Sequence, residues 1–322
     1  MSGEIETVIA VDVGGTEIKG AVCDAGGAAL AQRRRPTPVS AGVPAVLDEI
    51  AGLITELASA AESTVRGVGL IMPGVVDAAA GIARYSTNIG WRDLAIRDQI
   101  RDRVGLPVAI EHDVRAGGLA EARLGAAHGV DEALFLAIGT GIAGASILGG
   151  RLVTGAGNLA GEIGHLPVFP DGELCACGQR GCTETYASAA ALPRRYRTLG
   201  GTGGERPEQI RAEQVIERAE AGDPIAVRVF DEAITALARA LVSYILLLDP
   251  ALIVIGGGLS LAGDRLLVPL VERIGLGLVW RDVPELVTAR FGADSGRVGA
   301  ALVGWQAYRS GLLATVPLAA TP

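Results

Sequence analysis

The sequence predicts an α/β protein that is built from two related units. Short apolar runs typical of strands alternate with longer segments of helical periodicity along its 322 residues. The stretches 8–22 and 134–148 share one pattern: an apolar strand, a glycine-rich turn that contains threonine, and a second apolar strand. Such self-similarity indicates two α/β units that face each other across a cleft. A chain of this length can also bury two hydrophobic cores.

The first half of the chain is expected to open with a hairpin around Gly14, Gly15 and Thr16. A later strand ends in a Pro-Gly pair, and another runs directly into a helix. Alternation of apolar residues predicts the strands, and a period near 3.6 predicts the helices. In chain order, the expected elements are strands 7–13 and 18–24, helix 43–62, strand 65–74, strand 106–113 and the helix that follows it.

The second half is expected to repeat the hairpin and then to continue with helices and two further strands. The repeated hairpin lies within 133–150, around Gly139, Thr140 and Gly141. One of the later strands ends in three glycines. The remaining elements are helices 212–221 and 224–248, strand 250–258, a further helix, strand 285–292 and a last helix near 297–311.

Composition and charge exclude several classes of protein. The net charge of −8 and the pI of about 5.1 argue against a nucleic-acid partner. No uninterrupted apolar run reaches the roughly 20 residues of a membrane helix. The first residues carry acidic and no basic side chains, which is not the pattern of a signal peptide. We therefore expect a cytoplasmic protein without a membrane partner, and in that reducing compartment clustered thiols suggest a metal before a disulfide.

The segment 164–182 holds three of the four cysteines and one of the three histidines. Three interpretations compete at this point: a disulfide knot, a nucleic-acid-binding zinc finger, or a metal clip that braces a catalytic site. The fourth cysteine, Cys23, lies in an apolar strand and is interpreted as a small core residue.

The glycine-rich turns are candidates for phosphate binding. A tight glycine turn exposes backbone N–H groups, and a neighbouring threonine hydroxyl adds a donor. Each turn alone could be an ordinary hairpin, but the pair, together with the glycines at 256–258, favours nucleotide phosphates. No Walker loop occurs. The stretch 139–144 matches GxGxxG, but a strand follows where a dinucleotide site needs a helix.

Four motifs resemble those of the sugar kinases of the ROK family (repressors, open reading frames and kinases). They are DVGGT at 12–16, PGVVD at 73–77, GTG at 139–141, and ExGH followed by CxCGxxGCxE across 162–184. The resemblance covers essentially the whole chain. It implies an actin-like ATPase (ribonuclease H-like) fold with two domains around a nucleotide and sugar cleft. It also implies the kinase branch, because the phosphate hairpin starts by residue 8 and leaves no room for the repressors' helix-turn-helix domain.

The resemblance assigns the domains and the metal. The small domain would be 1–117, completed by a C-terminal helix at about 304–322, and the large domain would be 118–303 with the zinc loop. One structural zinc would be held by His165, Cys175, Cys177 and Cys182. One imidazole and three thiolates suit a tetrahedral Zn²⁺ site. A disulfide knot would leave an odd thiol, and a nucleic-acid finger would need a basic helix.

The resemblance also places the groups that bind the sugar. Glu162, His165 and Glu184 would contact sugar hydroxyls, and the histidine would bind zinc through one ring nitrogen and sugar through the other. Carboxylates accept hydrogen bonds from vicinal hydroxyls, as a polyol requires. Asn88, within the STNIGW stretch at 86–91, is a further candidate contact.

Asp113, at the end of strand 106–113, matches the catalytic base of the family, although it could also be only the N-cap of the next helix. The residue before it departs from the family pattern. Relatives carry an Asn that hydrogen-bonds a sugar hydroxyl, whereas this chain carries His112, which is larger and titrates near neutral pH. The departure puts the identity of the substrate in question more than the reaction.

On the nucleotide side, the resemblance places Asp12 near Mg²⁺ and the β- and γ-phosphates. Mg²⁺ prefers oxygen ligands and keeps several waters, so one carboxylate can be sufficient. The remaining groups expected to bind ATP are Gly14, Gly15 and Thr16 on one side, Gly139, Thr140 and Gly141 on the other, and Gly257 and Gly258 beside the adenosine.

The predicted function is an ATP- and Mg²⁺-dependent sugar kinase that phosphorylates a primary hydroxyl, with O6 of glucose as the default acceptor. The alternatives are another hexose, an amino sugar (N-acetylmannosamine, N-acetylglucosamine or kanosamine), a cyclitol, or a non-catalytic sugar sensor. Polyphosphate in place of ATP stays open. A homo-oligomer, either dimer or tetramer, is expected from the relatives.

Overall fold

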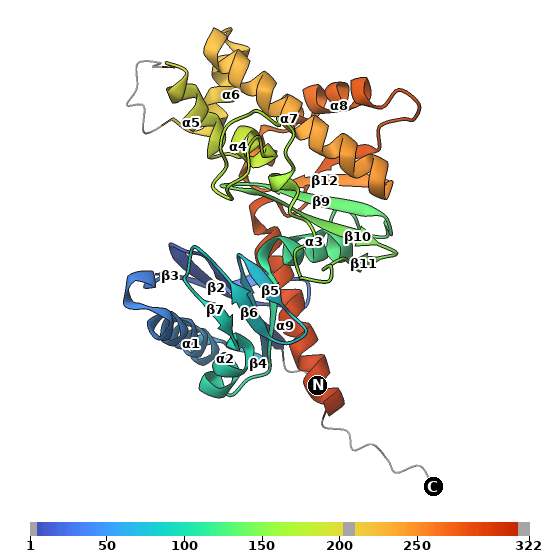
Figure 1. Cartoon of the computed structure of the whole chain (residues 1–322). Helices are drawn as coiled ribbons and strands as arrows, with labels where there is room; N and C mark the ends of the chain where they lie inside the picture. The colour runs from blue at the N-terminus through green and yellow to red at the C-terminus, as the bar shows by residue number, and fades with distance from the viewer. Residues whose placement is uncertain (1–4, 202–209, 315–322) are drawn as a thin grey trace. The chain divides into compact units, whose positions relative to one another are not determined.

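The computed structural model describes residues 5–201 and 210–314. Residues 315–322 of the predicted C-terminal helix lie outside this range. Contacts divide the chain into two compact units (Figure 1). Unit 1 comprises Met1–Ala120 together with Asp294–Pro322, and unit 2 comprises Glu121–Ala293.

Unit 1 is built on a five-stranded mixed sheet of order β3-β2-β1-β4-β8. β2 and β3 are antiparallel to their neighbours, whereas β1, β4 and β8 are parallel. The two antiparallel strands follow each other through short turns, and the parallel strands are joined by helical connections. The strands are β1 (Glu6–Val13), β2 (Glu17–Cys23), β3 (Ala29–Pro36), β4 (Thr64–Met72) and β8 (Val108–His112).

Helices cover both faces of this sheet, as the period-2 alternation of strand side chains requires. Ile9 and Val11 point into a core with α1 (Val43–Ala60) and α2 (Ile96–Val104). Val8 and Ala10, on the opposite face, pack with α9 (Ser295–Ala314). α9 packs along β4, β1 and β8, so the whole helix belongs to unit 1.

α3 (Asp113–Leu124) follows β8 directly, and a small sheet contains β5 (Val75–Asp77), β6 (Ile82–Tyr85) and β7 (Arg92–Leu94). α3 and α9 approach at Gly299, where a Cβ would lie 2.0 Å from the backbone oxygen of Ala116. Glycine at this position therefore allows the two helix backbones to touch.

Unit 2 repeats the strand order of unit 1 as β11-β10-β9-β12-β13. β9 and β10 form the second hairpin, and β9, β12 and β13 are parallel. The duplication predicted from the two glycine-rich hairpins is therefore present in the topology. The strands are β9 (Ala133–Ile138), β10 (Ile142–Leu148), β11 (Arg151–Leu152), β12 (Leu252–Gly256) and β13 (Glu285–Thr288).

The helices of unit 2 bury the apolar residues of β9 and β12 in one core. The longest, α7 (Pro224–Leu248), is capped at its N-terminus by Asp223, whose carboxylate accepts hydrogen bonds from the backbone N–H groups of Ile225 and Ala226. Across the described residues, no helix combines the length and the apolarity needed to cross a membrane. The other helices are α4 (Thr183–Ala187), α5 (Ala191–Thr198), α6 (Ala212–Glu220) and α8 (Asp264–Gly277).

Candidate functional site

The four predicted zinc ligands lie together in unit 2. His165 ends a short 3₁₀ helix at Ile163–His165, Cys182 precedes α4, and Cys175 and Cys177 lie in the loop between them. Their ligand atoms all lie within 4.8 Å of one another. The Sγ atoms of Cys177 and Cys182 are 3.6 Å apart, and Nδ1 of His165 is 3.9 Å from Sγ of Cys175. All the cysteines are free thiols.

This cluster fits a zinc ion. Bonds of about 2.0–2.3 Å in a tetrahedral site separate the ligand atoms by roughly 3.5–3.8 Å, close to the distances found. Burial and the two neighbouring thiols raise the pKa of Cys182 to about 12, whereas hydrogen bonds to Cys177, Thr185 and Cys182 overcome the effect of burial and lower the pKa of Cys175 to about 7. The three adjacent thiols therefore cannot all be ionised near neutral pH unless a cation neutralises them.

The loop that carries these ligands is tied to the body of unit 2 by hydrogen bonds and ion pairs. Within the loop itself, Gly181, at φ +72°, packs so closely on Phe169 that a Cβ would overlap the Phe169 backbone oxygen. The carboxylate of Glu173 accepts from both Arg194 and Arg195 of α5, each at 2.8 Å. The sequence contains these pairs, but only the fold shows that α5 lies against the loop.

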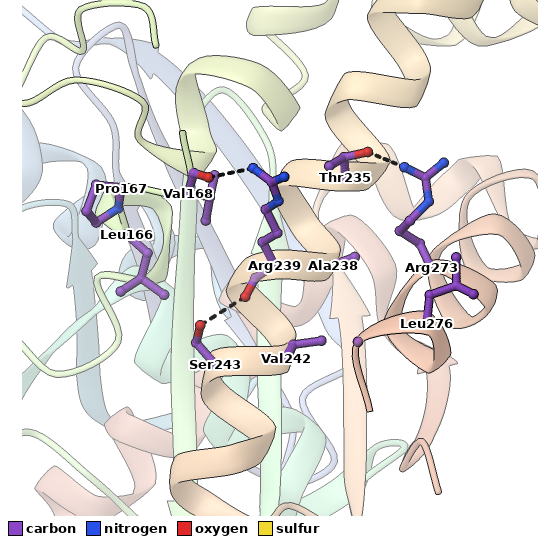
Figure 2. Close-up of a pocket in the computed structure, with 11 residues that line it drawn as sticks. Leu166, Pro167, Val168, Thr235, Ala238, Arg239, Val242, Ser243, Arg273 and Leu276 are labelled. Carbon is purple, nitrogen blue, oxygen red and sulfur yellow. Dashed lines mark hydrogen bonds between the residues drawn. The ribbon is translucent and has the colours of Figure 1, made fainter. Parts of the chain in front are cut away.

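The segment after His165 lines a cavity of about 650 Å³ (Figure 2). Nη1 of Arg239, on α7, crosses it and donates to the backbone oxygen of Val168 at 2.9 Å. The cavity contains none of the predicted sugar- or nucleotide-binding residues, and the contact across it fixes the segment to α7. Its lining consists of Leu166, Pro167, Val168, Thr235, Ala238, Arg239, Val242, Ser243, Arg273, Leu276 and Gly277.

His165 presents its two nitrogens to different partners. Nδ1 faces the thiols, and Nε2 lies 3.9 Å from Oε2 of Glu162. The side chains of His165 and Glu162 are 34% and 43% exposed. A metal on Nδ1 would therefore leave a donor N–H and a carboxylate side by side and accessible to hydroxyl groups.

Glu184 connects the zinc loop to the second glycine turn. Its Oε2 accepts a hydrogen bond from the backbone N–H of Ile142 at 2.8 Å, and a Cβ on Gly141 would lie 2.5 Å from the same oxygen. Gly257, at φ +76°, comes from the end of β12 and would place a Cβ 2.5 Å from the backbone oxygen of Ile138. The structure thus gathers Gly139–Gly141, Gly257 and Glu184 at one edge of the sheet. Cβ atoms on Gly139 and Gly258 would point into open space.

Asp12 and Asp113 lie near each other in unit 1. Asp12 is aligned with Ile71 of β4, which is aligned with Glu111 of β8, two residues before Asp113. The carboxyl ends of the parallel strands therefore bring both carboxylates to one edge. Burial and the charge of Asp113 raise the pKa of Asp12 to about 6, against the opposing effect of Lys19.

The carboxylate of Asp113 is held on one side only. Its Oδ1 accepts from the backbone N–H of Val114 at 2.7 Å and lies 3.3 Å from Nε2 of His112. Oδ2 accepts no hydrogen bond from the described residues, and the side chain is 36% exposed. Exposed Asn88 lies against Gly15 of the first glycine turn, where a Cβ would be 3.1 Å from its own Cβ. Five of the predicted residues of unit 1 are thus gathered at this edge: Asp12, Gly15, Asn88, His112 and Asp113.

An ion pair beside this edge was not predicted from the sequence. Glu111 and Arg115 form it at 2.7 Å, and the arginine side chain is only 3% exposed. The feature of the sequence that could have indicated this pair is the i, i+4 spacing of a carboxylate and a guanidinium across the strand-to-helix junction. The pair fixes the backbone on both sides of Asp113.

Comparison with known proteins identifies the class to which this fold and site belong. The model of the ROK family matches residues 8–306, and the chain belongs to the ROK family. A glucokinase of Streptomyces coelicolor is 34% identical over 307 residues, which cover 91% of this chain and 96% of that protein. The predictions of family and fold are therefore confirmed.

Two further relatives bear on the substrates. The crystal structure of a ROK family glucokinase from Streptomyces griseus, in complex with glucose and AMPPNP, superposes with a TM-score of 0.80 at 33% identity, covering 93% of this chain and 99% of that one. An N-acetylmannosamine kinase of Escherichia coli is 30% identical over 300 residues, which cover 92% of this chain and 98% of that protein.

Proposed function

We propose that the protein is an ATP- and Mg²⁺-dependent sugar kinase that transfers the γ-phosphoryl group to O6 of glucose. The observation that carries the proposal is the metal-type cluster that includes His165, whose Nε2 lies 3.9 Å from Glu162, because an imidazole and a carboxylate side by side are suited to bind a polyol. The relatives that bind or phosphorylate glucose support the same acceptor.

Asp113 is proposed as the base of the reaction. Its free Oδ2 accepts the proton of the acceptor hydroxyl as that oxygen attacks the γ-phosphorus, and the bond to the β-phosphate oxygen breaks to release ADP. Phosphoryl transfer depends mainly on positioning and on neutralising charge, so a base held by Val114 and by the β8–α3 junction suits it.

The nucleotide is proposed to bind through the two glycine turns. Backbone N–H groups of Gly14, Gly15 and Thr16, and those of Gly139–Gly141, are suited to phosphate oxygens. Gly257 and Gly258 would lie beside the adenosine. Asp12 offers a carboxylate oxygen, the donor type that Mg²⁺ prefers, and bound Mg²⁺ would neutralise phosphate charge. His165, Cys175, Cys177 and Cys182 would hold the structural zinc.

An amino sugar is the second candidate acceptor, and His112 is the observation that favours it. His112 stands where the family pattern described above has an Asn before the base, and one relative is named an N-acetylmannosamine kinase. Glu162 and His165 would bind the hydroxyls that both types of sugar share.

A coupled assay of ADP release tests the proposal. The acceptors are glucose, mannose, N-acetylmannosamine, N-acetylglucosamine, kanosamine and a cyclitol, each with ATP and with polyphosphate as donor. We expect the highest kcat/KM for glucose with ATP, and ³¹P NMR should find the phosphate on the primary hydroxyl. Preference for an amino sugar would select the second candidate. Turnover of no polyol by zinc-loaded protein would contradict kinase activity and favour a sensor.

A further inference from the structure

We propose that Glu173 and Arg195 are positioning residues for the zinc site. They hold the segment 173–182, here called the thiol hairpin, in ligating geometry before the metal binds. This segment carries the three cysteine ligands. The inference rests on the proposed zinc site and is independent of the kinase reaction. The observation that suggests it is the set of hydrogen bonds that converge on Glu173, two residues before Cys175.

The main chain of Glu173 closes the thiol hairpin. Its carbonyl oxygen accepts from the backbone N–H of Gly181 at 2.8 Å, and Gly181 directly precedes Cys182. Inside this closure, the backbone N–H of Cys175 donates to the oxygen of Gln179 at 2.7 Å. These bonds join backbone atoms alone, so the hairpin can form without any bond from a cysteine side chain to a metal.

The side chain of Glu173 attaches the thiol hairpin to α5. Its Oε1 accepts from Nε of Arg195, and its Oε2 accepts from Nη1 of Arg194, both at 2.8 Å. Nη2 of Arg194 also donates to the backbone oxygen of Thr185, in α4, at 2.6 Å. Each oxygen of the carboxylate thus has its own charged donor, and hydrogen bonds of this kind are roughly twice as strong as neutral ones.

Arg195 connects the thiol hairpin to the body of unit 2. Its side chain is only 6% exposed, whereas that of Arg194 is 43% exposed. Its Nη2 forms an ion pair with Oε2 of Glu232, on α7, at 2.6 Å, and its guanidinium lies over the ring of Tyr186 at 4.4 Å. Water does not solvate a guanidinium this deeply buried when a carboxylate is removed, so its pair with Glu173 contributes more than an exposed pair would.

Tyr186, on α4, fixes Glu173 from another side. Its hydroxyl oxygen accepts from the backbone N–H of Glu173 at 2.8 Å. The ring of Tyr186 packs on that of Phe169 with 4.6 Å between centroids, and Tyr186 belongs to the core of unit 2. The main chain and the side chain of Glu173 are therefore both held by α4 and α5, neither of which carries a metal ligand.

The four ligands are thus held in two different ways. Cys175, Cys177 and Cys182 lie on a hairpin that the protein itself positions, whereas His165 ends the short 3₁₀ helix outside it. Binding a metal then requires little further ordering on the thiol side, and the entropy cost of assembling the site is lower. Replacing side chains that orient metal ligands typically costs about 10–100-fold in metal affinity.

The first experiment measures the zinc affinity of the full chain by competition with a chromophoric chelator. Glu173→Gln and Arg195→Met should each weaken zinc binding by about 10–100-fold. Arg228→Met is the matched control, because Arg228 pairs with Glu232 at 3.0 Å and its side chain is 64% exposed. It should change zinc affinity by less than about twofold. Affinities of the first two variants within about twofold of the wild type would overturn the inference, and a wild type without zinc would overturn the zinc site itself.

A second control separates an effect on the site from a general loss of stability. Asp223→Ala removes the N-cap of α7 and should lower the melting temperature. Asp223 lies outside the thiol hairpin, so the zinc affinity of the folded variant should stay within about twofold of the wild type. If its zinc affinity fell as far as that of Glu173→Gln, the effect would be one of general stability, and the inference would be wrong.

The second experiment needs no variant. Hydrogen exchange of the wild type, with zinc and without it, follows the backbone N–H groups of Cys175 and Gly181 inside the hairpin and that of His165, which donates to the oxygen of Glu162 at 3.0 Å. Removing zinc should speed exchange at Cys175 and Gly181 by less than about threefold, but at His165 by about tenfold or more. Equal acceleration at all three positions would show that the metal alone orders the hairpin and would overturn the inference.

Discussion

Replacing Asp113 with Asn should strongly lower activity and, at neutral pH, stabilise the fold. Asp12 is the reason for the second effect. Burial and the nearby Asp113 raise its pKa from 3.8 to about 6, so its ionised form is disfavoured in the folded protein. The folded state holds this proton more tightly than the unfolded chain does. The free energy of unfolding therefore falls as the pH rises from about 4 to about 6, and the full penalty is present at pH 7.

The magnitude follows from the causes of the shift. A displacement of about two pKa units corresponds to roughly 3 kcal/mol between the protonation states. Burial is the largest cause and persists in the variant, whereas the charge of Asp113 is the second cause and is removed. We expect Asp113→Asn to raise the free energy of unfolding by about 0.5–1 kcal/mol at pH 7. The asparagine Oδ1 can still accept from Val114, so the helix start is retained.

Urea unfolding without divalent cation or nucleotide measures this effect at pH 7 and at pH 4.5. At pH 4.5, Asp12 is largely protonated in the folded state, and the gain should shrink toward zero. The control is Asp102→Asn, which removes a charge whose side chain is 68% exposed, and it should change stability by less than about 0.5 kcal/mol. In the same preparations, kcat of Asp113→Asn should fall by about 10²–10⁴. Equal gains at both pH values, or near-normal turnover, would refute the assignment of the two carboxylates.

Three further variants test the parts of unit 2. Elemental analysis should find one zinc per chain in the wild type. Cys182→Ser should lose the metal and raise the KM for sugar more than the KM for ATP. Equal increases in both KM values would contradict a specific role of the zinc loop in sugar binding. Gly257→Ala should destabilise the fold by about 1–3 kcal/mol, because φ is +76° and a Cβ would meet the backbone oxygen of Ile138 at 2.5 Å; an unchanged melting temperature would contradict this. Arg239→Met should keep the packing of the aliphatic stem but lose the hydrogen bond to Val168, lower the melting temperature by a few degrees and speed the release of zinc to a chelator. Zinc release at the wild-type rate would show that α7 does not secure the loop.

Several features of the fold could be predicted because they depend on local sequence. The hairpins of β1–β2 and β9–β10 were predicted from apolar runs on either side of glycine turns, and their similarity indicated the duplication that the two sheets confirm. The small sheet of β5, β6 and β7 was missed, as was α2. Strands of three or four residues are too short for a period to register, and α2 buries only Ile96 and Ile100 within a highly charged segment.

The candidate site was predictable in its residue types and not in its contacts. The spacing of His165, Cys175, Cys177 and Cys182, with the family resemblance, specified a cluster that the structure brings together. The hydrogen bond from Ile142 to Glu184 joins residues far apart in the chain, so no local pattern encodes it. His112 illustrates the same limit. The sequence showed that it departs from its relatives, but only the structure places its Nε2 3.3 Å from Oδ1 of Asp113.

A metal clip is a physical solution to the problem of holding polar groups on irregular backbone. Between the short 3₁₀ helix that ends at His165 and the start of α4, the backbone forms turns and isolated bridges, with no longer element to fix it. A loop of this kind gains little from hydrophobic burial and loses much conformational entropy on ordering. Four ligands on one ion would restrict both of its ends, and with them Glu162 and Glu184.

The second glycine turn does not depend on the metal in the same way, because it closes the ladder between β9 and β10. Glu184 adds one hydrogen bond to a turn that the sheet already holds. Loss of zinc should therefore disorder first the carboxylates proposed to bind sugar, and leave the N–H groups proposed to bind phosphate largely in place. Because the metal holds the loop whereas the sheet holds the turn, the metal-free protein is expected to lose affinity for sugar before it loses affinity for nucleotide.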